Sequence, residues 1–132
     1  MSDFRYSVRV QYVDTDQGGV VHHAAYLRFL EGARVELLRS RGIDYRRFEL
    51  EVGKGLPVTE ARVRYRRPAR FDDQLEIETW VPIVNRAKIR FDSRIWRGDT
   101  LLTEAEITCA CVLLAEGRIC SMDPSIRAAF ER

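Results

Sequence analysis

Apolar and polar residues alternate near the N-terminus in a pattern typical of a half-buried β-strand. The apolar positions are Phe4, Tyr6, Val8, Val10 and Tyr12. A period of two places these side chains on one face of a strand, so the pattern predicts a strand over residues 4–12. The segment that follows, residues 14–19, is rich in Asp and Gly and therefore predicts a turn.

A long amphipathic helix is predicted next, over about residues 24–41. Its apolar residues recur at the spacing of three and four that marks one face of a helix. They are Tyr26, Leu30, Ala33 and Leu37, and the stripe is widened by Leu27, Phe29 and Leu38. Gly42 follows the last of them and predicts the end of the helix.

The rest of the chain is predicted to form mainly strands joined by short turns. The predicted strands cover residues 62–66, 75–83, 87–95 and 102–114, with a short strand after Gly117. Asp123 and Pro124 then predict the N-cap and first position of a last helix that ends at Phe130. Short turns imply antiparallel neighbours, and one long helix packed on an antiparallel sheet is an α+β domain.

Length and charge restrict the classes of protein further. The 132 residues fit a single domain, 1–132, and the 45% of apolar residues suffices for a core. The formal net charge of +2 gives no reason to expect a nucleic-acid partner. No apolar stretch approaches the roughly 20 residues of a transmembrane segment, and no signal region follows Met1. Three cysteines without disulfide spacing agree with a reducing compartment, so a cytoplasmic location is predicted.

The chemistry-bearing residues gather in residues 12–26, between the first strand and the long helix. This connection holds two aspartates, two adjacent glycines and both histidines of the chain. Glycine lets the backbone approach a ligand, and a helix N-terminus offers unpaired amides that hold a developing oxyanion. A carboxylate beside them can attack a carbonyl or activate water. The alternative is that these are only turn and cap residues, and Asp14 is predicted to be structural.

A long motif in this connection resembles the YbgC-type acyl-CoA thioesterases, which belong with the 4-hydroxybenzoyl-CoA thioesterases among hot-dog proteins. The matching positions are residues 8–10, 14–16 and 18–21, His23, Tyr26, Leu27, Glu31, Ala33 and Arg34. The resemblance continues weakly at residues 68–73, 75–77 and 104–106. The sequence departs from the common pattern at Val13, where a glutamate is frequent, and at His22, where an aromatic residue is frequent.

The resemblance implies a hot-dog fold, in which a five- to six-stranded antiparallel sheet wraps one long helix. It implies an acyl-CoA thioesterase, with Asp16 as nucleophile or general base. The His23 amide would lie in the oxyanion site while its ring orients substrate or water, and Tyr12 matches a tyrosine of some family active sites. The predicted substrate contacts in the same connection are Gly19, Val20 and Val21.

Basic residues and cysteines complete the set of candidates. Arg86 and Lys88 are predicted contacts of the coenzyme A phosphates, with an exposed strand face as the alternative interpretation. Cys109 and Cys111 are predicted to be small core residues. We expect no metal, because adjacent histidines and scattered cysteines lack ligand geometry, and no cofactor, because coenzyme A is part of the substrate.

The resemblance also implies a homodimer with sites built from both chains, assembled further into a homotetramer. Open strand edges in a single sheet give an independent reason to expect a partner subunit. Acyl carrier protein remains an alternative donor of the acyl group. Two other functions stay open: a hot-dog dehydratase or hydratase with Asp16 paired to His23, and a non-catalytic protein that binds acyl groups.

Overall fold

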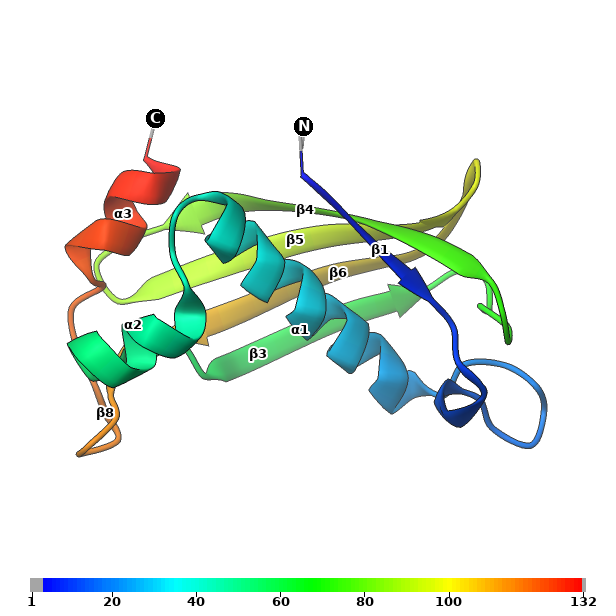
Figure 1. Ribbon diagram of the computed structural model, residues 1–132, viewed down its shortest axis with the longest axis horizontal. Helices are drawn as coiled ribbons and strands as arrows, with labels where there is room; N and C mark the ends of the chain where they lie inside the picture. The colour runs from blue at the N-terminus through cyan, green and yellow to red at the C-terminus, as the bar shows by residue number, and fades with distance from the viewer. Residues whose placement is uncertain (1–3, 132) are drawn as a thin grey trace.

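The main element of the fold is a five-stranded antiparallel sheet in the order β1-β4-β5-β6-β3 (Figure 1). The computed structural model describes residues 4–131. The strands are β1 (Arg5–Arg9), β3 (Val58–Tyr65), β4 (Gln74–Val84), β5 (Lys88–Arg97) and β6 (Thr100–Ala110). β1 and β3 are therefore the two edges of this sheet.

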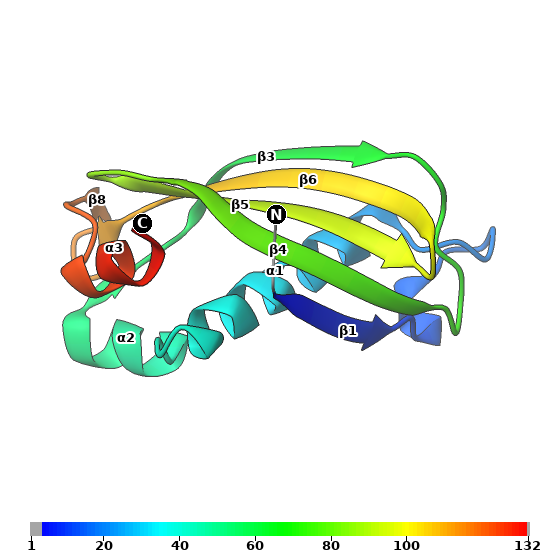
Figure 2. The same cartoon turned by 90° about the horizontal axis from the view of Figure 1, so that it is seen from above.

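The long helix α1 (His23–Ser40) lies against one face of the curved sheet (Figure 2). Its buried residues are Ala25, Tyr26, Phe29, Leu30, Ala33, Leu37 and Leu38. They meet the alternate inward residues of the strands, among them Leu75, Ile77, Ile89, Phe91, Ile95 and Ile107. Leu27 was expected on the same apolar stripe but is 45% exposed and lines a surface pocket with Val58 and Ile107. The arrangement confirms the predicted α+β class and the hot-dog architecture.

A second, three-stranded sheet is built from short segments at one end of the main sheet. It consists of β2 (Lys54–Gly55), β7 (Val112–Leu113) and β8 (Arg118–Ile119) in the order β2-β7-β8. The continuous strand predicted over 102–114 is wrong, because the chain changes sheets at Cys111. The Cys111 amide still donates to the Ala87 carbonyl in the register of β5 and β6, but the next residues form β7, which pairs with β2 and β8.

Three shorter helices complete the fold. The 3-10 helix η1 (Tyr12–Asp14) shows that the predicted first strand is too long, since the strand ends at Arg9. Helix α2 (Tyr45–Val52) was not predicted, although Asp44 caps its start and Gly53, with a φ of 75°, ends it. Helix α3 (Pro124–Phe130) begins at the predicted cap, Asp123. Across residues 4–131, no helix has the length and apolar character needed to cross a membrane.

Candidate active site

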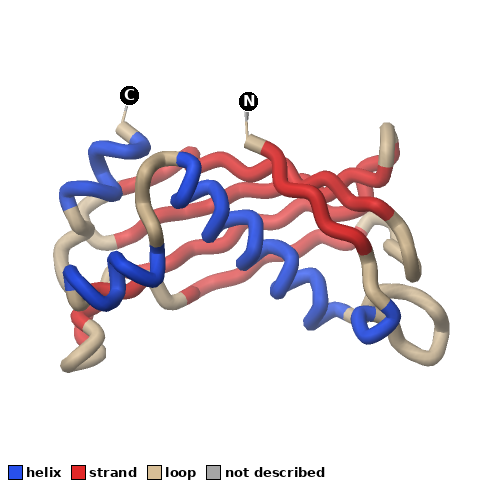
Figure 3. The backbone as a smooth tube through the Cα atoms, viewed as in Figure 1, coloured by secondary structure: helices blue, strands red, loops and turns tan. Residues whose placement is uncertain are grey.

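The loop between η1 and α1 is a small hairpin at the end of the sheet where α1 begins (Figure 3). The Asp16 amide donates to the Val20 carbonyl at 2.9 Å, and the Gly19 amide donates back to the Asp16 carbonyl at 3.0 Å. Gly19 has a φ of 80°, the left-handed conformation that closes a three-residue hairpin loop of this type. The sequence therefore folds into a turn that fixes the backbone of Asp16.

The carboxylate of Asp16 is exposed and is oriented by its own turn. Its Oδ1 accepts a hydrogen bond of 2.8 Å from the Gly18 amide. A Cβ atom at Gly18 would lie 3.2 Å from this oxygen, so glycine leaves room for the close approach. Within residues 4–131 the carboxylate of Asp16 makes no ion pair, and its negative charge is therefore available to a ligand.

The N-terminus of α1 lies directly after this hairpin. His22 is the N-cap, and its Nδ1 accepts a hydrogen bond of 3.3 Å from the Ala25 amide. The amides of His23 and Ala24 belong to the first turn, whose amides have no acceptor inside the helix. The His22 amide donates to the Asp14 carbonyl at 3.0 Å, which ties the start of the helix to the chain segment that leads into Asp16.

The exposed imidazole of His23 is held against an aromatic ring from another part of the chain. It stacks on Tyr65, the last residue of β3, with ring centroids 4.5 Å apart and an angle of 17° between the planes. Tyr65 in turn contacts the ring of buried Tyr26 edge-on at 5.1 Å. The sequence analysis missed Tyr65, because nothing local in the strand pattern indicates a contact with a residue 42 positions earlier.

The contacts of Asp14 confirm the structural role predicted for this residue. Its side chain is buried and forms an ion pair with Arg28 of α1, and its Oδ2 accepts from the Gln11 amide at 2.8 Å. The two aspartates of the motif thus differ in environment: Asp14 joins the loop to the helix, whereas Asp16 faces solvent.

Tyr12 and the backbone of residues 19–21 lie on the same loop but in different settings. Tyr12 is 79% exposed and packs edge-on against Phe71, with centroids 5.4 Å apart. Val20 is bridged to Arg70, and the Val21 amide donates to the Ala69 carbonyl at 2.9 Å. These backbone contacts hold residues 20 and 21 of the loop against residues 69 and 70. The structure records no contact between the Tyr12 ring and Asp16 or His23 among the described residues.

Arg86 and Lys88 are not brought to this loop within one chain. They lie at the turn between β4 and β5, on the end of the sheet where α3 is found, whereas α1 begins at the other end (Figure 1). The two predicted phosphate contacts and the loop that carries Asp16 therefore lie at opposite ends of the sheet within one chain.

An apolar cavity of about 240 Å³ lies between the C-terminal half of α1, the start of α2 and the sheet. It is lined by Glu31, Arg34, Val35, Leu38, Tyr45, Leu56 and Phe91. The Tyr45 hydroxyl accepts a hydrogen bond of 2.7 Å from the Leu56 amide, and burial raises the pKa of Tyr45 to about 12. The neutral phenol of Tyr45 thus holds the backbone at Leu56, which leads into β3, beside this mainly apolar cavity.

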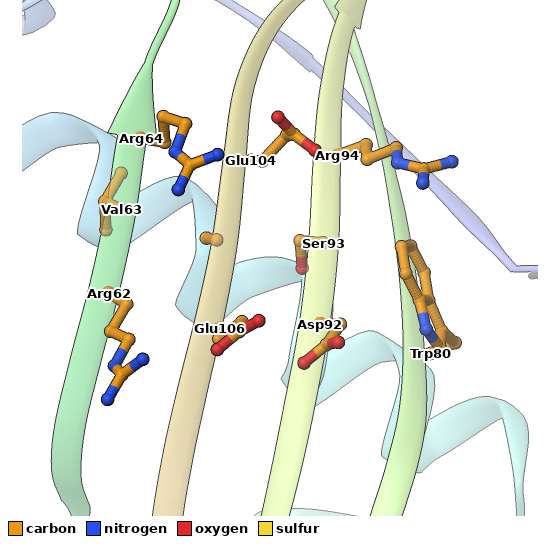
Figure 4. A pocket seen from close by; sticks show the side chains of 10 residues that line it. Arg62, Val63, Arg64, Trp80, Asp92, Ser93, Arg94, Glu104 and Glu106 are labelled. Atoms are coloured by element: carbon orange, nitrogen blue, oxygen red, sulfur yellow. The ribbon is translucent and has the colours of Figure 1, made fainter.

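A second hollow, of about 380 Å³, lies on the face of the sheet that points away from α1 (Figure 4). Arg64, Glu104 and Arg94 stand directly opposite one another there on three neighbouring strands. Cross-strand pairing of opposite charges accounts for these residues. The predicted site residues do not line this hollow, and we assign it no part in the chemistry.

Among residues 4–131, no group of three or more His, Cys, Asp or Glu side chains is placed to hold a metal ion. The loop itself offers a carboxylate, an imidazole and backbone amides.

Comparison with known proteins decides the family. The family model described as the thioesterase-like superfamily matches residues 10–130. The chain belongs to the thioesterase-like superfamily. This membership and the relatives described next confirm the family resemblance and the predicted enzyme class, a thioester hydrolase.

Individual members of the thioesterase-like superfamily match the chain over almost its full length. It is 39% identical to the acyl-CoA thioester hydrolase YbgC of Escherichia coli O6:H1, covering 98% of this chain and 96% of that protein. It is 38% identical to the acyl-CoA thioesterase YbgC of Haemophilus influenzae, covering 96% and 93%. A crystal structure of a hypothetical protein from Thermus thermophilus superposes with a TM-score of 0.90 at 33% identity, covering 98% and 97%.

Proposed function

We propose that the protein hydrolyses the thioester bond of an acyl-coenzyme A at the loop before α1. One observation carries this proposal: the exposed carboxylate of Asp16 lies in a rigid turn directly before the free amides of a helix N-terminus. The superfamily membership and the acyl-CoA activities named for the relatives from Escherichia coli and Haemophilus influenzae support it.

In this mechanism the thioester carbonyl oxygen accepts hydrogen bonds from the amides of His23 and Ala24. Their alignment with the positive end of the helix dipole stabilises the oxyanion as the carbonyl is attacked. Asp16 either attacks the carbonyl carbon itself or takes a proton from the attacking water. The carbon–sulfur bond then breaks, the thiolate of coenzyme A leaves, and one water is consumed to give the free acid. The ring of His23 orients the substrate or the water.

The homodimer expected from the family has a physical basis in strand β3. Within residues 4–131, β3 pairs on one side only, with β6, and most of its residues are exposed. An unpaired edge of eight residues is a template for pairing with another strand. We infer that β3 pairs antiparallel with its copy in a second subunit, which extends the sheet across the dimer. Further assembly into a tetramer stays a prediction.

Such a pair would complete the site. Tyr65, which stacks on His23, ends β3, whereas Leu56 precedes its start. Antiparallel pairing brings the end of one β3 beside the start of the other, so the partner's His23 approaches the cavity behind Leu56. An apolar cavity of about 150 Å³ holds benzene, so the cavity of about 240 Å³ has room for an aromatic or short aliphatic acyl group.

The same pairing gives a role to the basic residues at the far end of the sheet. Ile89 of β5 pairs with Cys109 of β6, which pairs with Val58 of β3. Lys88 precedes Ile89 in β5, so it lies two strand spacings, roughly 10 Å, from the β3 edge. We propose that Arg86 and Lys88 of one subunit contact the coenzyme A phosphates of a substrate held at the partner's loop. Acyl carrier protein remains the alternative donor.

The decisive test is thiol release from a panel of acyl-coenzyme A substrates by the wild type, Asp16→Asn and Asp99→Asn. Asp99 is also an exposed aspartate, in the turn after β5, and serves as the matched control. We expect the wild type and Asp99→Asn to release thiol at equal rates, and Asp16→Asn to be slower by a factor of about 100 or more. An unimpaired Asp16→Asn would overturn the assignment of the site.

The two alternative functions give different outcomes in the same assay. A dehydratase or hydratase changes the absorbance of an enoyl thioester without releasing thiol. A non-catalytic binding protein retains acyl-coenzyme A in equilibrium dialysis and turns none of it over. The cytoplasmic location and the absence of a cofactor stay predictions from the sequence.

A further inference from the structure

Two of the three cysteines lie side by side in the fold although they are nine residues apart in the chain. Cys111 follows β6 directly, and Cys120 follows β8 directly. Their sulfur atoms are 3.6 Å apart, with the Cys120 thiol donating to the Cys111 sulfur. The Cys120 amide also donates to the Cys111 carbonyl at 2.8 Å. The third cysteine, Cys109, lies in β6 and is buried in the core.

The backbone positions of this pair suit a covalent bond. In the small sheet Val112 faces Ile119 and Leu113 faces Arg118, so the same register places Cys111 opposite Cys120. Residues directly opposite in an antiparallel ladder have Cα atoms about 4.5 to 5.5 Å apart. A disulfide accepts Cα separations of about 4.4 to 6.8 Å. The sulfur atoms therefore need to approach by side-chain rotation, without a rearrangement of the two strands.

We propose that Cys111 and Cys120 form a reversible dithiol–disulfide site that low-molecular-weight disulfides oxidise. The two cysteines flank β7 and β8 of the second sheet, at the end of the molecule away from the start of α1 (Figure 1), so the site is distinct from the catalytic loop. No residue of the proposed hydrolysis mechanism takes part in it.

The order of the steps follows from the exposure of the two thiols. Cys120 is partly exposed, whereas Cys111 is fully buried, and burial together with the neighbouring Cys120 raises the pKa of Cys111 to about 11. The Cys120 thiolate therefore attacks one sulfur of the reagent, forming a mixed disulfide and expelling one thiolate. Cys111 then loses its proton and attacks the Cys120 sulfur, which expels the second thiolate. Two electrons pass to the reagent and two protons are released, so the two protein thiols become one disulfide.

The bond would fasten the second sheet to the main sheet. The Cys111 amide donates to the Ala87 carbonyl at 2.8 Å, and the Met122 amide donates to the Arg86 carbonyl at 2.6 Å. A link between Cys111 and Cys120 closes the loop 112–119 and holds both of these anchors at the β4–β5 turn. The expected consequence is greater protection of amide hydrogens in β7 and β8 from exchange, lost again on reduction.

The test is oxidation of the folded chain with oxidised glutathione, followed by alkylation of the remaining thiols and peptide mass mapping. For the wild type we expect free thiols to fall from three to one per chain, a Cys111–Cys120 cross-linked peptide, and full reversal by dithiothreitol. Cys109→Ala, the matched control, should form the same cross-link. Cys120→Ala should form none, and Cys111→Ala should stop at a glutathione adduct on Cys120.

Two results would overturn the proposal. The first is a wild-type chain that keeps three free thiols or stops at the glutathione adduct, since Cys111 then fails to resolve it. The second is a cross-link that involves Cys109, since the fold places that residue outside the pair. Circular dichroism spectra of each variant distinguish a lost thiol from a lost fold.

Discussion

The imidazole of His23 stacks on the phenol ring of Tyr65, with ring centroids 4.5 Å apart and planes inclined by 17°. The contact joins the first residue of α1 to the last residue of the edge strand β3. It therefore links the orientation of the proposed catalytic imidazole to the strand that is expected to form the subunit interface. Burial raises the pKa of the Tyr65 phenol, so the ring that supports His23 is neutral at physiological pH.

Replacing Tyr65 tests whether this stacking positions the imidazole. An aromatic pair contributes about 0.5 to 1.5 kcal/mol, so we expect Tyr65→Ala to lower kcat by a factor of up to about ten. Tyr65→Phe keeps the ring and should retain wild-type kcat. The measurement is steady-state thiol release with kcat and KM determined separately. Equal impairment of both variants would instead assign a role to the hydroxyl, and equal activity of all three proteins would remove Tyr65 from the mechanism.

Replacing the two aspartates of the loop one at a time should affect stability in one case and activity in the other. Asp14 is buried against Arg28 and the Gln11 amide. Asp14→Asn weakens both interactions, and we expect it to lower the free energy of unfolding by about 1 to 3 kcal/mol. Asp16→Asn should leave that free energy nearly unchanged, because its carboxylate is exposed. Urea unfolding monitored by circular dichroism measures both. A destabilised Asp16→Asn with a stable Asp14→Asn would reverse the assignment.

Local patterns were sufficient to predict most of the fold. The alternation in residues 75–83 and 87–95 corresponds to β4 and β5, and the apolar stripe and Gly42 correspond to α1, which ends at Ser40. The break at Cys111 was not predictable, because apolar residues continue from Cys109 to Ala115 and no polar or turn residue marks it. The change of sheets follows from the pairing of β7 with β2 and β8, and the pairing with β2 joins segments more than 50 residues apart in the chain.

Only the part of the candidate site that lies in residues 12–26 was predictable from the sequence. The loop and the helix start hold Asp16 and His23 together because the chain connects them within a few residues. Tyr65, the last residue of β3, and Phe71, which follows that strand, contact His23 and Tyr12, and no spacing in the sequence indicates these contacts. The distance along the sheet between Arg86 and the loop was equally hidden, since it follows from the direction in which β4 runs.

A charge at the middle of β3 should prevent the proposed pairing of subunits. Ala61 is exposed near the centre of the strand, so a two-fold axis there brings the two copies of this residue close together. We expect Ala61→Glu to place two like charges opposite each other and to produce monomers. Ala128→Glu, an exposed position on α3, is the control that should keep the wild-type mass. Light scattering after size-exclusion chromatography gives the mass, and thiol release should be lost with the dimer. A monomeric wild type with full activity would contradict the composite site.

Asp123 should make the stability of α3 depend on pH. Burial acts to raise the pKa of this N-cap carboxyl, but hydrogen bonds from Ser125 and the charge of Lys54 outweigh it and lower the pKa below its usual value. The stabilisation is therefore complete above the unfolded-state pKa of about 3.9 and is lost as the pH falls through the lower, folded-state value. Asp123→Asn keeps a capping side chain without the charge.

We expect this variant to be less stable than the wild type by about 0.5 to 1 kcal/mol near neutral pH, and equally stable once Asp123 is protonated. Urea unfolding at about pH 7 and about pH 2 measures the difference at both limits. A difference that stays constant between them would show that the carboxylate charge does not stabilise α3. The same cap lies three residues after Cys120, so the comparison is made under reducing conditions, with both thiols free.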